Sequence, residues 1–143
     1  MTRYVLDTNI ISDVTKPEPA EALVKWMAGQ ADENLFIASL TVGEVRRGIL
    51  QMHAGTKRRA LERWFAGPEG PQALFAGRVL PFDEAAALVW ARLMAEGTTM
   101  GRPRSALDMI IAAVAEANDC VIATSNERDF AGVRIVNPLR AEA

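Results

Sequence analysis

Four acidic residues from separate parts of the chain are the side chains best suited to chemistry: Asp7, Glu44, Asp108 and Asp129. Each stands where a chain of alternating strands and helices would begin a helix. If the strands form one parallel sheet, all four carboxylates face the edge at which strands end, where such sheets bind ligands. Carboxylate clusters suit hard cations such as Mg²⁺, which prefers oxygen ligands. The pattern indicates a metal site and either phosphoryl transfer or phosphodiester hydrolysis.

Helix capping is the simpler explanation for each acid taken alone, because an acid in the first turn stabilises a helix without any metal. Thr41 and Glu44 have the spacing of a capping box, in which the two side chains satisfy N–H groups at a helix start. Four such acids brought to one edge favour a shared metal site over four independent caps.

Short apolar runs alternate with helical patterns, and these elements must position the acids. Strands are expected near residues 4–6, 35–38, 79–80, 120–124 and 133–136. Helices are expected after Asp7 and near residues 22–29, 41–52, 56–65, 83–97 and 105–118, with a short helical turn at 126–129. Segment 67–71 is expected to be a loop too short to link two domains. This order predicts an α/β fold in one domain, residues 1–143, with a mainly parallel sheet covered on both faces.

Composition excludes several classes of protein. Half of the 143 residues are hydrophobic and 24% are charged, which is typical of a globular domain and not of a disordered chain. The net charge of −2 argues against a protein that binds nucleic acid over its whole surface. Local basic patches remain available at Arg46 and Arg47, in the stretch 57–63, and at Arg102 and Arg104.

The single cysteine, Cys120, rules out an internal disulfide and favours a reducing, cytoplasmic setting. Neither a signal peptide nor a membrane span is expected. The only histidine, His53, has no Ser or Cys partner nearby in sequence, so a nucleophile–histidine pair and a zinc site both lack their parts. No glycine-rich phosphate-binding loop is present.

Five segments in order give the chain a resemblance to a known family. They are residues 4–9 (YVLDTN), 39–45 (SLTVGEV), 107–115 (LDMIIAAVA), 123–130 (ATSNERDF) and 136–138 (VNP). With them the chain resembles the PIN-domain ribonucleases, and in particular the VapC-like toxins of bacterial toxin–antitoxin pairs. The similarity runs nearly end to end, and it implies a PIN-like three-layer α/β/α sandwich.

The resemblance also implies an activity, a cofactor and partners. The expected activity is Mg²⁺- or Mn²⁺-dependent endonucleolytic cleavage of RNA, by a homodimer that an antitoxin protein inhibits in a toxin–antitoxin hetero-oligomer. By position, Asp7 and Asp108 would be the principal metal ligands, Glu44 a ligand or an organiser of the site, and Asp129 the fourth acid. The residues that would orient the carboxylates and metal-bound waters are Thr8, Asn9, Thr124 and Asn126.

One position departs from the family pattern. Many relatives carry an acid where this chain has Asn126, and here the acid comes three residues later, at Asp129. Asp129 either replaces the missing acid or is dispensable, and one or two metal ions are both compatible with the sequence. The expected reaction is in-line attack by a metal-activated water, which leaves a 3′-hydroxyl and a 5′-phosphate.

Two other functions stay open at this point. One is a Mg²⁺-dependent phospho-acceptor regulator, in which one aspartate becomes phosphorylated. The other is an inactive PIN-like module that binds RNA or a protein. For the nuclease, transfer RNA, ribosomal RNA and messenger RNA are all possible substrates.

Overall fold

Five short strands form the centre of the molecule. In the computed structural model, which describes residues 1–140, they are β1 (Tyr4–Leu6), β2 (Leu35–Ala38), β3 (Val79–Leu80), β4 (Val121–Ala123) and β5 (Ile135–Val136). Their order across the sheet is β3-β2-β1-β4-β5, and every neighbouring pair is parallel. All five expected strands are therefore present, and the expected mainly parallel sheet is confirmed.

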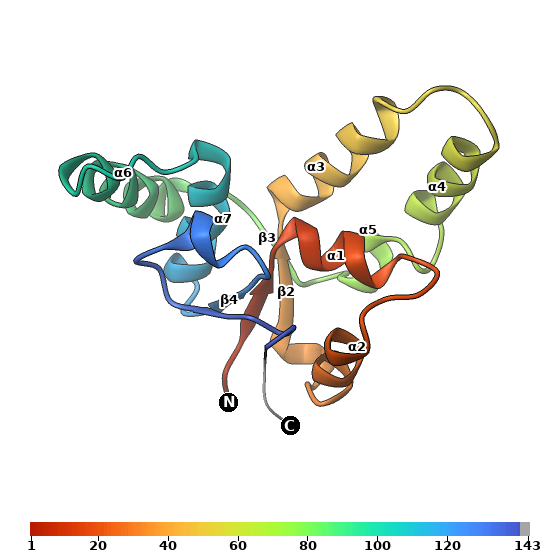
Figure 1. Ribbon diagram of the computed structural model, residues 1–143, viewed down its shortest axis with the longest axis horizontal. Coiled ribbons are helices and arrows are strands. Elements are labelled where there is room, and N and C mark those ends of the chain that lie inside the picture. The colour runs from red at the N-terminus through yellow and green to blue at the C-terminus, as the bar shows by residue number, and fades with distance from the viewer. Residues whose placement is uncertain (141–143) are drawn as a thin grey trace.

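Helices cover both faces of this sheet (Figure 1). One side carries α1 (Thr8–Val14), α2 (Glu21–Ala28), α3 (Ser39–Leu50), α4 (Thr56–Ala66) and α5 (Pro71–Leu74). The other side carries α6 (Glu84–Thr99) and α7 (Ala106–Ala117). Two short 3-10 helices, η1 (Asp32–Asn34) and η2 (Glu127–Phe130), complete the elements. The arrangement is the expected three-layer α/β/α sandwich.

The apolar residues of the central strands divide between the two faces, because successive side chains of a strand point to opposite sides. Val5 and Ile122 pack with α6 and α7, whereas Leu6 and Ala123 pack with the helices of the opposite layer. Strands buried on both faces read as continuous apolar runs, which is why these short segments were recognisable in the sequence.

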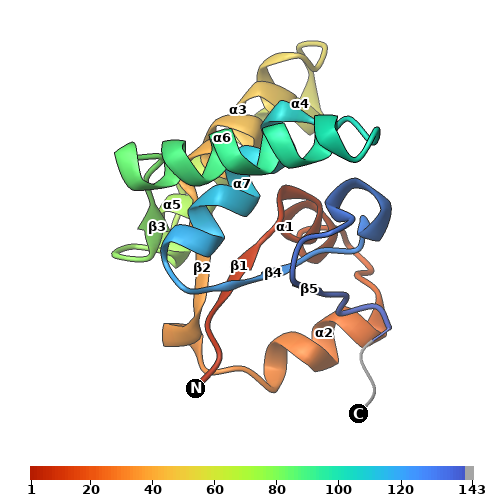
Figure 2. The ribbon, with the colours of Figure 1, turned by 90° about the vertical axis from the view of Figure 1, so that its left-hand side faces the viewer.

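Helix α7 is the most deeply buried helix and lies between the sheet and α6 (Figure 2). Met109 and the run 111–115 are all buried, as expected of a helix that is apolar on nearly every side. Phe130 of η2 belongs to the same cluster and is buried. This packing fixes the start of α7 and the η2 turn relative to the sheet.

The start of α3 differs from the sequence-based expectation. The helix begins at Ser39, directly after β2, and its cap residue Ala38 offers no side-chain hydrogen bond. Thr41 is a buried residue within the helix, so the capping box predicted for Thr41 and Glu44 is wrong. The chain passes from strand to helix without a loop, and Glu44 lies beyond the first turn.

The loop expected at 67–71 also contains more structure than its composition suggested. Pro71 opens the one-turn helix α5, because proline lacks the N–H that a first helical position does not need. A Cβ at Gly70 would lie 2.2 Å from the carbonyl oxygen of Phe65, so the approach of α5 to α4 requires glycine. Within residues 1–140, no helix is both long and apolar enough to cross a membrane.

Candidate active site

Asp7 is the buried centre of the candidate site. It follows β1, its side chain is 3% exposed, and it caps α1 by accepting a hydrogen bond from the Thr8 N–H at Oδ1, 2.8 Å away. Its other oxygen, Oδ2, accepts a hydrogen bond from the Thr124 hydroxyl, also at 2.8 Å. Asp7 is thus a helix cap, as the simpler interpretation proposed, but the cap uses only one of its two oxygens.

The surroundings of Asp7 work against its negative charge. Burial raises the pKa of this carboxyl from 3.8 to about 6, although the hydrogen bonds from Thr124 and Thr8 act in the opposite direction. The carboxylates of Asp108 and Glu44 raise the pKa further through like-charge repulsion. Three acids from separate elements are therefore close enough to influence one another.

Glu44 reaches this region from α3. Its Oε1 accepts a hydrogen bond from the Thr8 hydroxyl at 2.6 Å, and its Oε2 lies 3.9 Å from Nη2 of the exposed Arg47. The glutamate side chain is 16% exposed. Thr8 also hydrogen bonds with the buried Thr41 hydroxyl at 3.2 Å, so Thr8 holds Glu44 against α1.

Asp108 enters from the first turn of α7. The Ser105 hydroxyl caps this helix by accepting a hydrogen bond from the Asp108 N–H at 3.2 Å, which confirms the expected helix start. Burial raises the pKa of Asp108, the nearby Asp129 and Glu44 carboxylates raise it further, and hydrogen bonding with Ser105 lowers it. Asp108 therefore links Asp129 electrostatically to Glu44.

Asp129 and Asn126 are both exposed residues of the segment that follows β4. The Asn126 backbone N–H donates to the Thr124 hydroxyl at 3.0 Å, and the Asp129 N–H donates to the Asn126 carbonyl at 3.1 Å. Asn126 thus contacts the site through its backbone. Asn9 is exposed, and within the described part of the chain its side chain forms no hydrogen bond with another residue.

The fold brings the four acids into one region, but their carboxylates do not surround a single point. Among residues 1–140, no group of three or more His, Cys, Asp or Glu side chains is close enough to hold a metal ion. In the same residues, no lysine or arginine forms an ion pair with Asp7, Asp108 or Asp129. An all-oxygen donor set with unneutralised charge fits a hard cation by its chemistry.

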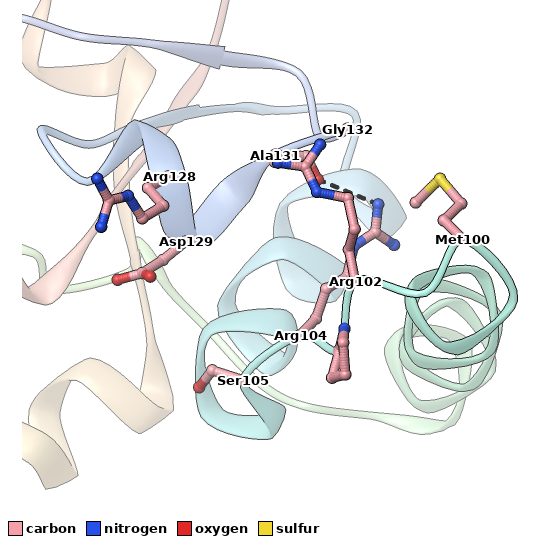
Figure 3. A pocket seen from close by; sticks show the side chains of 9 residues that line it. Met100, Arg102, Arg104, Ser105, Arg128, Asp129, Ala131 and Gly132 are labelled. Atoms are coloured by element: carbon pink, nitrogen blue, oxygen red, sulfur yellow. Dashed lines mark hydrogen bonds between the residues drawn. The ribbon is translucent and has the colours of Figure 1, made fainter.

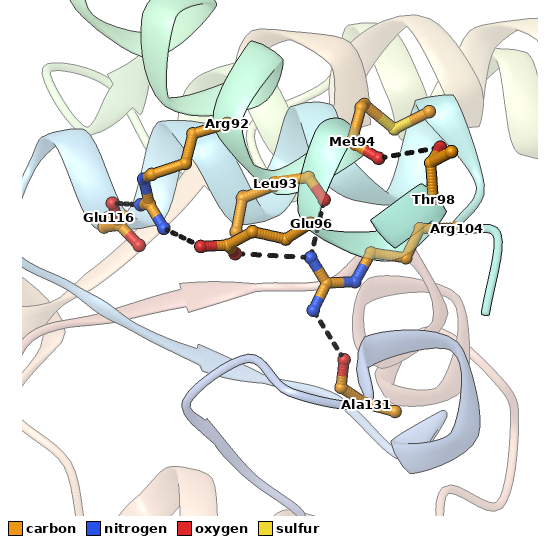
Figure 4. A network of polar contacts seen from close by, with 8 residues as sticks. All are labelled: Arg92, Leu93, Met94, Glu96, Thr98, Arg104, Glu116 and Ala131. Carbon is orange, nitrogen blue, oxygen red and sulfur yellow. Dashed lines mark hydrogen bonds and ion pairs between the residues drawn. The ribbon is translucent and has the colours of Figure 1, made fainter. Parts of the chain in front are cut away.

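Two residues of this region were not singled out as site residues from the sequence. Thr41 was assigned only to a cap, and its burial beside Thr8 depends on how α1 packs on α3. Arg104 was assigned with Arg102 to a local basic patch, but its side chain is only 6% exposed. Figure 4 shows how Arg104 joins α6 to the segment after η2. Neither position carries a local sequence signal for its role.

The family model described as PIN domain matches residues 4–136 of this chain. The chain belongs to the PIN-domain family. Two relatives match this PIN domain over nearly its full length. The VapC ribonuclease Y4jK of Sinorhizobium fredii is 40% identical over 94% of this chain and 96% of its own. The toxin FitB of Neisseria gonorrhoeae is 35% identical over the same shares.

Solved structures agree with this assignment. The crystal structure of FitAcB from Neisseria gonorrhoeae superposes on this PIN domain with a TM-score of 0.88 and 34% identity, covering 96% of this chain and 99% of that one. A member of the VapBC family of toxin–antitoxin systems from Mycobacterium tuberculosis superposes with a TM-score of 0.63 and 30% identity, covering 92% and 90%. The expected PIN-like fold is confirmed.

Proposed function

We propose that this PIN domain is an endoribonuclease that cleaves RNA by metal-dependent hydrolysis and acts as the toxin of a toxin–antitoxin pair. The observation that carries the proposal is the buried Asp7, held by Thr8 and Thr124 within the influence of Asp108 and Glu44. Support comes from the relative named VapC ribonuclease, which is 40% identical to this chain over 136 residues.

In this proposal Asp7, Asp108, Glu44 and Asp129 hold Mg²⁺ or Mn²⁺, which would lower the pKa of a water and neutralise charge on the scissile phosphate. Thr124 and Thr8 keep the Asp7 carboxylate in one orientation, because each oxygen has a fixed donor. Thr8 does the same for Glu44 through its hydroxyl. These contacts preorganise the acids before substrate arrives.

Two helix starts add to the electrostatics of the site. Asp7 lies at the start of α1, and Asp108 lies in the first turn of α7. The partial positive charge of a helix N-terminus stabilises a nearby carboxylate, and it also attracts a phosphate. These helices therefore oppose part of the repulsion among the acids and between the acids and RNA.

The proposed inhibitor is an antitoxin that inserts a basic side chain among the acids. A guanidinium pairs bidentately with carboxylates, and Asp7, Asp108 and Asp129 have no such partner within residues 1–140. A relative of this fold is described as a member of a toxin–antitoxin family. We also propose that the free protein is a homodimer, which light scattering at micromolar concentrations tests directly.

Asp7 itself is disfavoured as a phospho-acceptor by its environment. A phospho-acceptor needs an accessible oxygen for attack on phosphorus, whereas Asp7 is 3% exposed and both of its oxygens accept hydrogen bonds. The inactive binding module remains the second candidate, favoured by the absence of a closed three-acid cluster among the described residues. A cleavage assay separates this module from the nuclease.

That assay incubates purified protein with total RNA in Mg²⁺, in Mn²⁺ or in EDTA. The proposal expects cleavage only with a divalent ion, and new ends that carry a 5′-phosphate. Asp83→Asn is the matched control, because Asp83 also caps a helix through its side chain but lies at the start of α6, outside the acid group. Absence of cleavage with either ion would leave the binding module as the better account.

A further inference from the structure

A pocket of about 360 Å³ lies beside the acids, between the turn that leads into α7 and the η2 segment. Ser105 and Asp129 line it, and both also belong to the acid region through Asp108. Figure 3 shows the pocket with the Asp129 carboxylate on one side and the Arg102 guanidinium near Gly132. The pocket therefore leads away from the proposed cleavage site.

Arg104 forms one wall of the pocket, and its guanidinium already has hydrogen-bond partners in the protein. Arg104 Nη1 donates to the Leu93 carbonyl at 2.6 Å, Nη2 donates to the Ala131 carbonyl at 3.1 Å, and Glu96 lies 3.6 Å away (Figure 4). Gly132 adopts a φ of 83°, and a Cβ there would lie 2.6 Å from Arg104 Nη2. These contacts hold the Arg104 guanidinium in place, so it is not available to a ligand.

Two other arginines at the pocket have no such commitment. Arg102 and Arg128 are both exposed, and neither side chain forms a hydrogen bond or an ion pair within residues 1–140. The Arg128 and Asp129 side chains leave η2 on the same side, whereas Arg102 lies at the other end of the pocket (Figure 3). Two exposed guanidinium groups at one pocket can both contact an anionic ligand that enters it.

We propose that this pocket binds a nucleotide of the RNA next to the cleaved bond, with Arg102 and Arg128 contacting backbone phosphates. The inference rests on the proposed function and specifies where the RNA strand lies on the protein. A guanidinium matches phosphate geometry with two parallel hydrogen bonds. The volume lies within the range of sites for small molecules, and Met100 and Pro103 offer apolar surface to a sugar or base.

Arg128 and Asp129 mark the end of the pocket that adjoins the acids, and Arg102 marks the other end. The phosphate contacts lie at the two guanidinium groups, which attract a phosphate, and not at the Asp129 carboxylate, which repels it. Arg128 is then nearest to the scissile phosphate, and Arg102 contacts a phosphate farther along the chain. Each arginine would add one charge-assisted contact with the substrate, separate from the contacts at the acids.

The test measures how RNA binding depends on salt. A fluorescent single-stranded RNA is titrated with protein between about 50 and 200 mM salt, where each lost phosphate contact reduces the slope of log affinity against log salt by about 0.7. Asp108→Asn serves as the background, so that cleavage does not interfere. Arg102→Gln and Arg128→Gln should each weaken binding about 3- to 10-fold and reduce the slope by about 0.7, and together by about 1.4.

Lys25→Gln with Arg134→Gln is the matched control for net charge. Lys25 lies on α2 and Arg134 directly precedes β5, so both are remote from the edge where the strands end, and both are exposed. This control pair should leave the slope within about 0.2 of the background. A double variant of Arg102 and Arg128 that matches the control pair in affinity and slope would overturn the proposal.

The cleavage assay of the wild-type protein separates this inference from the proposed function. Cleavage by the wild type together with an unchanged slope in the arginine variants would refute the pocket and leave the nuclease intact. A reduced slope in these variants without any wild-type cleavage would support the pocket and refute the nuclease. In an active enzyme, the arginine variants should raise KM more than they lower kcat, because the contacts hold substrate away from the reacting phosphate.

Discussion

The Thr124 hydroxyl lies 2.8 Å from Asp7 Oδ2, although the two residues are 117 positions apart in the chain. The register of the sheet explains this contact, because Leu6 pairs with Ala123 in the parallel strands β1 and β4. The next residue of each strand then lies at the same edge. The Thr124 oxygen also accepts the N–H of Asn126 at 3.0 Å, so it joins Asp7 to the segment that carries Asp129.

Thr124→Val should impair the site while preserving the buried shape. The variant removes the hydroxyl that donates to Asp7, and a hydrogen bond to a charged group is worth about 1.5–3 kcal/mol, so kcat/KM should fall about 10- to 100-fold. The pKa of Asp7 should also rise, which would move the acid limb of the pH–rate profile to higher pH. Thr124→Ser keeps the hydroxyl and should restore most activity. Equal activity of the Val and Ser variants would contradict the role given to Thr124.

Asp7 should make the metal-free protein less stable as the pH rises. Its folded-state pKa is raised from 3.8 to about 6, so the native state binds more protons than the unfolded state between these values. The contribution of Asp7 to the free energy of unfolding should therefore fall across this window, by about 3 kcal/mol at roughly 1.4 kcal/mol per pKa unit. Asp7→Asn should remove this dependence and be the more stable protein above about pH 6 in EDTA. Chemical denaturation at several pH values measures the difference, and a difference independent of pH would refute the account.

Gly132→Ala should destabilise the fold through Arg104. Alanine at a φ of 83° is strained, and its Cβ would lie 2.6 Å from Arg104 Nη2. The free energy of unfolding should therefore fall by about 1–3 kcal/mol. Gly48→Ala is the matched control, because Gly48 lies within α3 and a Cβ there meets no atom within 4 Å. That change should stabilise the protein by about 0.5–1 kcal/mol. Thermal unfolding that ranks the two variants in the opposite order would refute this account of the Arg104 wall.

Co-purification from the native host should yield the protein bound to its antitoxin. The complex should cleave RNA far more slowly than the free protein, because the inserted basic side chain neutralises the acids and competes for the metal-binding oxygens. Adding excess Mn²⁺ should recover part of the activity if the competition is direct. A complex that cleaves RNA as fast as the free protein would exclude inhibition at the acids.

The sequence was sufficient for the sheet and for the position of Asp108. Apolar runs identified all five strands, and Ser105 marked the start of the helix that carries Asp108. The sequence did not reveal that α3 begins at Ser39, because direct passage from strand to helix depends on tertiary packing and leaves no capping signal. The backbone contact of Asn126 and the burial of Arg104 were equally hidden, since both depend on how distant segments meet. Topology was therefore predictable, whereas side-chain contacts at the site were not.

Substitutions that keep shape and remove charge separate metal binding by the acids from helix capping. Asp7→Asn retains an oxygen that can cap α1, and Asp108→Asn and Glu44→Gln change their side chains equally little. RNA cleavage with Mg²⁺ or Mn²⁺ is measured beside thermal unfolding in EDTA, with Asp83→Asn as the control. The account predicts that Asp7→Asn and Asp108→Asn lose cleavage by about 100-fold or more while folding as stably as the wild type or more so, because repulsion among the acids is relieved. Full cleavage by folded Asp7→Asn and Asp108→Asn would contradict it.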